Sequence, residues 1–356
     1  HDGAMSKKIA IAAGGTAGHV VPALAVADAL RAEGAEVSFI GGERVEAQLV
    51  PAAGYPLHTI SVEGLSRTNP LRAARALARS ASAVMSSRAL LAELEPDAVM
   101  GGGGYVAAPV GAAALTRRIP LVLTEADSHL GLTNRALAPF ARRVCLSFAI
   151  EGRAGSRYRV TGRPIPAFET DRASARERFG IPAGEPCVLV FGGSLGARTI
   201  NRAALGAFSS GVPRVLHVCG RRDYAELSAH PLPTGYDLRE YLDIAEFADA
   251  LAACDLVVAR AGGSVFEIAA HGLPAILVPY PHASADHQSA NARWMAHAGA
   301  AIVIDDADLN AAGLAREVAA LIANPARLAT MASASGSLAR PLAARDIAAE
   351  LLEAAR

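Results

Sequence analysis

Two glycine-rich turns, one in each half of the chain, carry the strongest chemical signal in the sequence. The first is GGTAGH, in which Gly14, Gly15 and Gly18 precede His19, and the second is GGSLGA at residues 192–197. Each turn follows an apolar run and opens a helical pattern. Glycine lets the backbone approach a ligand closely, and a helix N-terminus offers unpaired N–H groups. Both turns therefore predict binding of an anionic or polyhydroxylated ligand, the alternative being that they only connect strand to helix.

Four side chains of the first half are candidates for chemistry at the same edge of the fold. His19 closes the first turn, and imidazole suits general-base work, although a structural histidine is the alternative. Tyr105 follows the glycines of GGGGY and is placed to stack on a sugar ring or an acceptor. Glu125 and Asp127 end another strand-like run, where either carboxylate can act as a base or hold sugar hydroxyls.

The second half offers two anchors for a phosphorylated ligand. Ser194 lies at the start of a helix, where its hydroxyl and the neighbouring N–H groups can bind a phosphate. The stretch AGGSVFE at 261–267 repeats this design, and Glu267 lies one turn into its helix, suitably placed for a bidentate bond to a ribose diol. Together these anchors predict a nucleoside diphosphate. Residues 279–291 add a cluster of sugar-binding groups without convincing metal-ligand spacing, namely Asp286, His287, Gln288 and Asn291.

These residues require a scaffold of parallel strands, and each half of the sequence predicts one. Apolar strand-like runs alternate with helical patterns, which predicts an α/β fold with helices on both faces of each sheet. The proline-containing stretch 159–168 separates the halves. We therefore expect a first domain at 5–163 and a second at 164–340, with a C-terminal helix at 341–356 packing back on the first.

Composition narrows the classes of function. Hydrophobic residues make up 52% of the chain and charged residues 19%, which excludes a disordered protein. Lys and Arg together number 34, as do Asp and Glu, so the overall charge gives no reason to expect nucleic-acid binding. The four cysteines stand singly in apolar runs, as reduced thiols do, and no apolar run is long enough to cross a membrane. The first turn lacks the G-x-G-x-x-G spacing of dinucleotide dehydrogenases.

The order and spacing of several stretches resemble the bacterial peptidoglycan N-acetylglucosaminyltransferases of the MurG type over essentially the full length. These stretches are GGTAGHVVPALAVADAL, GGGGYVAAP, GLTNRALAPFARRV, GGSLGARTIN and AGGSVFEIAAHGLPAILVPYPHASADHQSANA. The resemblance implies a GT-B fold, in which two Rossmann-like domains face each other across a cleft. It also implies inverting transfer of N-acetylglucosamine from UDP-N-acetylglucosamine to the C4 hydroxyl of undecaprenyl-diphosphate-N-acetylmuramoyl-pentapeptide, with no cofactor and no metal.

The same resemblance implies a set of site residues. The donor side would comprise Ser194, Leu242 through its backbone at the uracil, Gly262, Gly263, Ser264, Val265, Phe266, Glu267 at the ribose and Gln288 at the sugar. The acceptor side would comprise Thr16, Ala17, Gly18, His19, Tyr105 and Glu125, with Asp127 and Arg163 as further substrate contacts. His19 is the expected base, helped by Asp127 or Glu125.

Three stretches depart from the commoner family pattern. The chain has Thr124-Glu125-Ala126-Asp127 where many members read H-E-Q-N, so that a carboxylate replaces an amide near the sugar. It has Gly162-Arg163-Pro164-Ile165-Pro166 where G-N-P-V-R is usual, and Leu195 replaces a glutamine. A related UDP-sugar transferase with another acceptor is therefore an alternative, as are a UDP-sugar 2-epimerase and a nucleotide-sugar sensor without turnover.

Membrane contact is predicted from the stretch between Arg67 and Arg88. It carries arginines interleaved with apolar side chains, namely Arg67, Arg72, Arg75, Arg79 and Arg88 with Leu71, Leu77, Val84 and Met85. Such a surface favours contact with anionic lipid, although a solvated helix face has the same pattern. We therefore expect a peripheral protein at the cytoplasmic face of the inner membrane.

Overall fold

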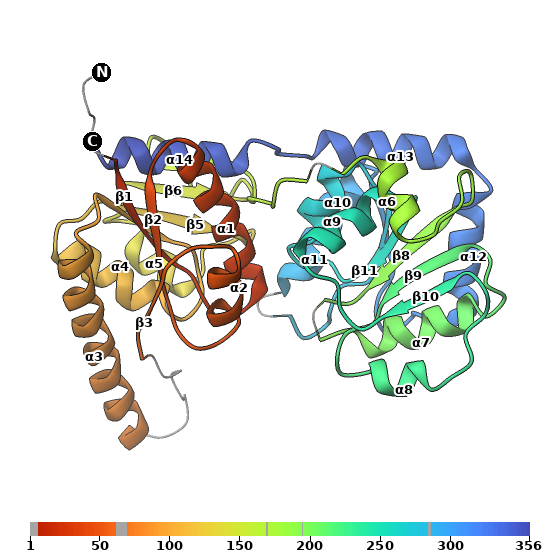
Figure 1. Cartoon of the computed structure of the whole chain (residues 1–356), viewed down its shortest axis with the longest axis horizontal. Helices are drawn as coiled ribbons and strands as arrows, with labels where there is room; N and C mark the ends of the chain where they lie inside the picture. Colours follow the sequence, from red (N-terminus) through yellow and green to blue (C-terminus); the bar gives the residue numbers. More distant parts are fainter. Residues whose placement is uncertain (1–5, 62–69, 169, 194, 284–285) are drawn as a thin grey trace. The chain divides into compact units, whose positions relative to one another are not determined.

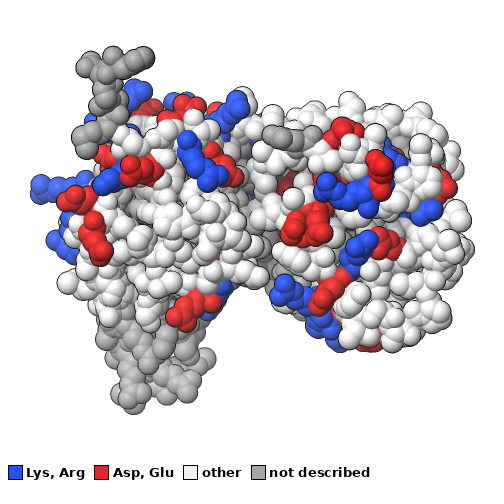
Figure 2. Space-filling view, in the orientation of Figure 1, with Lys and Arg blue, Asp and Glu red and all other residues white. Residues whose placement is uncertain are grey.

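The computed structural model describes residues 6–61, 70–168, 170–193, 195–283 and 286–356, and within 70–80 it describes the backbone alone. The chain divides into two compact units. One runs to Pro166 and takes in Arg340–Arg356, and the other is Ala167–Ala339. The division falls inside the proline-containing stretch 159–168 (Figure 1). Acidic and basic side chains are interspersed over the visible face of each unit, as expected for a chain without net charge (Figure 2).

Seven parallel strands form the sheet of the first unit, in the order β3-β2-β1-β4-β5-β6-β7. The strands are β1 (Lys8–Ala12), β2 (Glu36–Gly41), β3 (Leu57–Thr59), β4 (Ala98–Gly101), β5 (Leu121–Glu125), β6 (Arg143–Leu146) and β7 (Tyr158–Val160). The helices are α1 (Ala17–Ala32), α2 (Glu46–Ala52), α3 (Pro70–Leu94), α4 (Ala107–Thr116), α5 (Leu132–Leu137) and α14 (Ala343–Ala354).

Two hydrophobic cores lie on the two faces of this sheet, because successive side chains of a strand point to opposite faces. Ile9 and Ile11 of β1 pack with α1 and with Leu351 of α14. Ala10, between them, faces the core that α3, α4 and α5 cover. Figure 1 shows α14 alongside α1. The last helix of the chain therefore completes the core of the first unit.

The sheet of the second unit has six parallel strands in the order β10-β9-β8-β11-β12-β13. The strands are β8 (Cys187–Phe191), β9 (Arg214–Val218), β10 (Tyr236–Arg239), β11 (Leu256–Ala259), β12 (Ala275–Leu277) and β13 (Ala301–Val303). The helices are α6 (Arg172–Arg178), α7 (Arg198–Ala207), α8 (Tyr224–Ser228), α9 (Ile244–Ala253), α10 (Val265–Ala270), α11 (His287–His297), α12 (Ala311–Ile322) and α13 (Pro325–Ser337). Val188 and Val190 of β8 face α7 and α12, while Phe191 packs edge-on against Phe247 of α9.

The strand order explains why certain turns meet. In each sheet the chain winds outward over three strands and then returns to the other side of the first, so β4 pairs with β1, and β11 pairs with β8. Open α/β sheets bind ligands outside the carboxyl ends of their strands at such a switch point. GGTAGH and GGGGY follow β1 and β4, and GGSLGA and AGGSVFE follow β8 and β11. Within each unit, topology brings together the two turns that the sequence singled out.

Candidate active site

The first glycine turn presents main-chain donors at the start of α1. Gly15 has φ +97°, in the region that glycine favours, and Thr16 is the extended N-cap residue. The carbonyl of Thr16 accepts bonds from the N–H groups of His19 at 3.0 Å and Val20 at 3.2 Å. The first N–H groups of a helix have no acceptor within the helix. The N–H group of Ala17, at the first helical position, is one of these and points out of the helix end. The turn therefore has the donor geometry that an anionic or hydroxylated ligand needs.

His19 stands against the second glycine turn of this unit. A Cβ atom at Gly103 would lie 2.6 Å from His19 Nδ1, so only glycine leaves room for the ring. Arg163 donates from Nη2 to the carbonyl oxygen of Gly18, which brings its charge near the ring. Burial lowers the pKa of His19 and Arg163 lowers it further, while Asp127 raises it. The net lowering keeps the imidazole neutral near neutral pH, in the form that accepts a proton.

Glu125 holds the loop that carries Asp127. It is 6% exposed, and its Oε1 accepts the N–H of Asp127 at 3.1 Å. Its Oε2 accepts the N–H of Gly131 and the Nδ2 of Asn134, both at 2.9 Å. Because both carboxylate oxygens already accept bonds, Glu125 is better suited to shaping this loop than to taking a proton. Asn134 was not recognised from the sequence, where it stood inside a matching stretch with no chemical signal of its own.

Tyr105 has partners within its own unit. Its hydroxyl donates to Glu46 Oε1 at 2.6 Å, and the guanidinium of Arg44 lies 4.6 Å from its ring centroid. Burial and the bond to Glu46 raise the pKa of Tyr105 to about 12. One face of the ring is thus occupied by Arg44, and contact of Tyr105 with a sugar stays a prediction. Glu46 was missed because a single acid in a short helical stretch reads as a solvent-exposed residue.

In the second unit, the turn after β8 touches the turn after β9 through main chain. Ser194 lies outside the described residues, but both flanking glycines are described, with φ +93° at Gly193 and +77° at Gly196. A Cβ atom at Gly196 would lie 1.9 Å from the carbonyl oxygen of Cys219, and one at Gly220 would lie 2.2 Å from the nitrogen of Gly196. Glycine is therefore required on both sides of this approach.

The loop at 262–267 offers main chain more than side chains. The side chains of Val265 and Phe266 are buried, so these two predicted substrate residues are limited to main-chain contact. Gln288 accepts the N–H of Tyr280 through Oε1 at 2.9 Å, and its Nε2 lies 3.9 Å from where a Cβ of Gly262 would be. The amide of Gln288 is thus held beside the loop, and its role at the sugar stays a prediction.

The remaining donor-side predictions fall on the same edge of the second sheet. Leu242 follows β10, and its side chain is 6% exposed, so contact of its backbone with a base stays a prediction. Glu267 lies in the first turn of α10 and is partly buried. Asn291 donates from Nδ2 to the carbonyl oxygen of Ala261 at 2.9 Å, which ties α11 to this loop.

Two family models match the chain over most of its length. The model of the glycosyltransferase family 28 N-terminal domain matches residues 9–146, and that of the C-terminal domain matches residues 187–351. The chain belongs to glycosyltransferase family 28. These two ranges include the glycine turns of both units, and this family 28 member is a hexosyltransferase of the GT-B fold.

Relatives place this family 28 glycosyltransferase in the MurG type. A protein of Moorella thermoacetica named "UDP-N-acetylglucosamine--N-acetylmuramyl-(pentapeptide) pyrophosphoryl-undecaprenol N-acetylglucosamine transferase" is 40% identical, over 97% of this chain and 98% of its own. A protein of Acidithiobacillus ferrooxidans with the same name is 41% identical, over 99% of both chains. The crystal structure of Acinetobacter baumannii MurG has a TM-score of 0.76 and 30% identity, covering 98% of this chain and 99% of that one.

Arg260 is a buried cation of the glycosyltransferase that the sequence did not reveal. It is 9% exposed, pairs with Asp306 at 2.6 Å and donates to Thr199 Oγ1 at 3.0 Å. It also donates to the carbonyls of Val278 and Pro279. Arg260 therefore ties together the segments that follow β11 and β12 and the start of α7. The signal that could have found it is a charged residue directly after the apolar run DLVVA.

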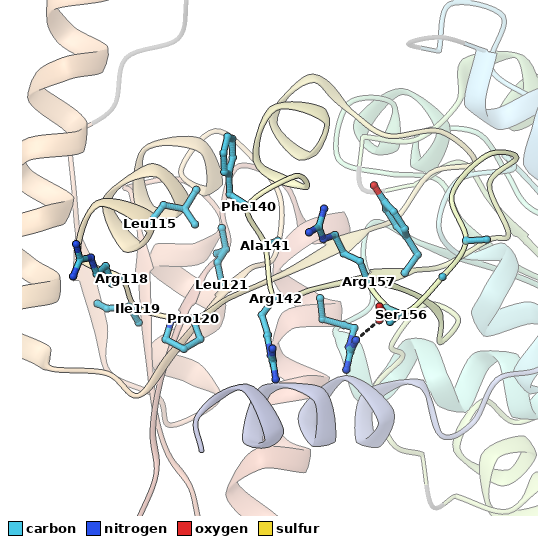
Figure 3. A pocket seen from close by; sticks show the side chains of 14 residues that line it. Leu115, Arg118, Ile119, Pro120, Leu121, Phe140, Ala141, Arg142, Ser156 and Arg157 are labelled. Carbon is cyan, nitrogen blue, oxygen red and sulfur yellow. Dashed lines mark hydrogen bonds between the residues drawn. The ribbon is translucent and has the colours of Figure 1, made fainter.

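The described residues contain no group of three or more His, Cys, Asp or Glu side chains placed to hold a metal ion. A pocket of about 770 Å³ lies in the first unit, at the edge opposite His19. Leu121, Arg143 and Tyr158, the first residues of β5, β6 and β7, line it, whereas the glycine turns follow strand ends. Figure 3 shows Leu115, Phe140 and Arg118 around this pocket, with Arg142 directed toward α14. It is therefore a separate feature from the candidate active site.

Proposed function

We propose that this glycosyltransferase moves N-acetylglucosamine from UDP-N-acetylglucosamine to the C4 hydroxyl of a lipid-linked N-acetylmuramoyl-pentapeptide, with inversion, in peptidoglycan synthesis. The donor and acceptor are those in the name of its full-length relative, which is 40% identical. The observation that carries the mechanism is the arrangement of His19, Arg163 and Asp127 beside a glycine turn. We propose that the first unit holds the acceptor and the second holds the donor.

In this mechanism His19 acts as the base. As the acceptor hydroxyl oxygen bonds to C1 of the sugar, its proton passes to the neutral imidazole, and the bond from C1 to the diphosphate oxygen breaks. UDP leaves with that electron pair, so one displacement inverts the configuration at C1. Arg163 keeps His19 neutral before the reaction, and Asp127 stabilises the imidazolium that forms. Glu125 positions Asp127 through the main chain.

On the donor side, main-chain groups carry most of the proposed recognition. The turn around Gly193 and Gly196, with Ser194 between them, would bind the diphosphate at the start of α7. Glu267 would bind the ribose, and Gln288 would bind the sugar through the amide nitrogen beside Gly262. These contacts supply fixed donors where negative charge develops on the leaving diphosphate.

Mass spectrometry of the reaction products tests this proposal. Purified protein is incubated with UDP-N-acetylglucosamine and a soluble analogue of the lipid-linked acceptor, and the expected product is the acceptor carrying one added N-acetylglucosamine. Omission of the acceptor should leave the donor intact. Formation of a 2-epimer of the donor, or transfer only to a different acceptor, would refute the proposed reaction.

We also propose peripheral contact with anionic membrane through the first unit, at the cytoplasmic face. No described helix combines the length and hydropathy needed to cross a bilayer. Of the stretch 67–88, Arg67 lies outside the described residues and the side chains up to 80 are not described, so the arginine pattern there stays a prediction. Met85 is 64% exposed, whereas Val84 is partly buried against the core, so Met85 is the more accessible of these two apolar side chains.

The described surface next to α3 supports this contact. Arg88 donates to the carbonyl oxygen of Thr116 at the end of α4, where the pocket of Figure 3 begins. Phe140, at its rim, is 70% exposed, and three exposed arginines line the pocket, namely Arg118, Arg142 and Arg157, while Arg143 is paired with Glu350. An exposed aromatic ring among cations matches an anionic lipid interface.

Liposome flotation tests the membrane proposal. The protein should float with vesicles that contain anionic lipid and stay unbound with neutral vesicles, and Phe140→Ser should weaken flotation. Val212→Ser is the matched control, because Val212 is an exposed apolar residue of the second unit at 76% exposure. Equal flotation of wild type and Phe140→Ser, or no flotation at low salt, would refute the proposed surface.

A further inference from the structure

Glu46 is a fully buried carboxylate of the first unit that has no place in the mechanism above. Its exposed fraction is 0%, and its Oε2 accepts the N–H of Gly15 at 2.8 Å. Its Oε1 accepts the N–H of Gly42 at 3.0 Å and the hydroxyl of Tyr105 at 2.6 Å. In the described part of the chain no lysine, arginine or histidine forms an ion pair with it. Two main-chain amides and one phenol therefore satisfy a buried charge.

The three donors come from three different loops. Gly15 follows β1, Gly42 follows β2, and Tyr105 follows β4, and these strands are neighbours in the order β2-β1-β4. One side chain thus ties together the carboxyl-end loops of the three strands around the switch point. A carboxylate holds these loops more strongly than a neutral acceptor would, because hydrogen bonds to a charged group are about twice as strong as those between neutral groups.

Packing around Glu46 leaves little freedom. A Cβ atom at Gly14 would lie 2.8 Å from Glu46 Oε1, and one at Gly41 would lie 2.9 Å from Glu46 Cγ. A Cβ atom at Gly42 would lie 1.8 Å from the hydroxyl oxygen of Tyr105. The glycines of these loops are therefore shaped around the carboxylate and its phenol partner.

Two of the three loops that Glu46 holds, those after β1 and β4, also define the position of His19. Gly15 immediately precedes Thr16, the N-cap residue whose carbonyl accepts the N–H of His19 at 3.0 Å. The ring of His19 packs against Gly103, in the loop that ends at Tyr105. We propose that Glu46 is a positioning residue for glycosyl transfer, which fixes the two loops between which His19 is held. This inference rests on the proposed function, in which His19 is the base.

The carboxylate must be ionised to accept all three bonds. Burial raises the pKa of Glu46, but the bonds from Tyr105, Gly15 and Gly42 outweigh that effect and leave it below its usual value. Glu46 is therefore charged throughout the neutral range. An amide in its place has one oxygen and one NH2 group, so one main-chain N–H would face another donor.

Glu46→Gln tests the proposal through steady-state kinetics. If the loops lose their anchor, kcat should fall by about ten- to a hundred-fold while the KM for UDP-N-acetylglucosamine stays within about two-fold, because a misplaced base costs rate without changing donor contacts. Tyr55→Phe is the matched control, since Tyr55 donates to Asp28 at 2.6 Å in the same unit, away from the glycine turns. It should keep wild-type kcat. Unchanged kcat in Glu46→Gln would overturn the proposal.

Hydrogen exchange separates this inference from the proposed reaction. In Glu46→Gln the amides of residues 13–19 should exchange faster than in wild type and in Tyr55→Phe, and this readout needs no turnover. Should Glu46→Gln not fold, Tyr105→Phe removes one of the three bonds and should give the same exchange pattern to a smaller extent. Exchange that matches wild type would overturn the anchoring role. If wild type shows no transferase activity but Glu46→Gln still exchanges faster than wild type, the proposed reaction alone is refuted and the anchoring role of Glu46 stands.

Discussion

At the scale of single residues, the charges around His19 set the pH at which it works. Burial and Arg163 lower its pKa below 6.5, and Asp127 raises it. A base must be unprotonated in the free enzyme, so kcat/KM should rise with pH through the pKa of His19. The acid limb of the profile should therefore have its midpoint below pH 6.5, the ordinary histidine value.

Two variants should move this limb in opposite directions. Arg163→Met removes a positive charge that disfavours imidazolium, so the pKa of His19 should rise and the limb should move to higher pH. Asp127→Asn removes a negative charge that favours imidazolium, so the limb should move to lower pH. Lys7→Met, which removes a surface cation paired with Asp97, is the control and should leave the limb in place. Shifts in the same direction for both variants would contradict the assignment.

At the scale of elements, glycines allow close approach between loops, and one pair of them offers a matched comparison. Gly196 has φ +77°, and a Cβ atom there would lie 1.9 Å from the carbonyl oxygen of Cys219. Gly299 has φ +81°, and a Cβ atom there would have no neighbour within 4 Å. Gly299→Ala should cost about 1 kcal/mol for its backbone conformation alone. Gly196→Ala should cost about 3 kcal/mol or more, because a clash with main chain adds to that strain.

Urea unfolding and donor titration check this prediction. Gly196→Ala should also weaken binding of UDP, since its turn carries the proposed diphosphate site, while Gly299→Ala should bind UDP as wild type does. Equal losses of stability in the two variants would mean that the loops can move apart at little cost.

The alternation of strands and helices could be predicted from sequence because its signals are local. Apolar runs followed by glycine turns marked β1, β4, β8 and β11, and the structure has a strand at each. Side-chain partners across loops could not be predicted. Glu46 and Arg260 have partners that are distant in sequence, and nothing near them in the sequence distinguishes a buried anchor from a surface charge. Asn134 bonds to Glu125, which is close in sequence, but an asparagine in a short helical stretch gives no sign of that role.

The burial of predicted site residues was also beyond the sequence. Val265 and Phe266 stood in a glycine-led motif that suggested ligand contact, yet their side chains belong to the core. A loop motif specifies a main-chain shape, and only packing decides which of its side chains point outward.

At the scale of the whole molecule, the chain crosses from the first unit to the second and returns, so its last helix stabilises the first unit. Leu351 of α14 is 0% exposed in the core with Ile9 and Ile11, and Leu351→Ala should cost about 2 to 5 kcal/mol. Leu342→Ala is the control, since Leu342 is 55% exposed and should change stability by less than about 0.5 kcal/mol.

The single tryptophan makes this prediction measurable. Trp294 lies in α11 of the second unit, with its ring 5.0 Å from that of Phe266, so its fluorescence reports on that unit. Leu351→Ala should lower the unfolding temperature of the first unit, measured by circular dichroism. It should leave the unfolding temperature measured by tryptophan fluorescence unchanged. A parallel shift of both transitions would show that the two units unfold together.

Release of UDP measures transfer to an acceptor with His19 as base most directly. Wild-type protein with UDP-N-acetylglucosamine should release UDP only when the acceptor analogue is present, with one product molecule per UDP. His19→Ala should bind UDP with unchanged affinity. It should form UDP from the donor, in the presence of acceptor, about a hundred-fold or more slowly than wild type. Release of UDP at the same rate without acceptor, or wild-type turnover by His19→Ala, would contradict transfer with His19 as base.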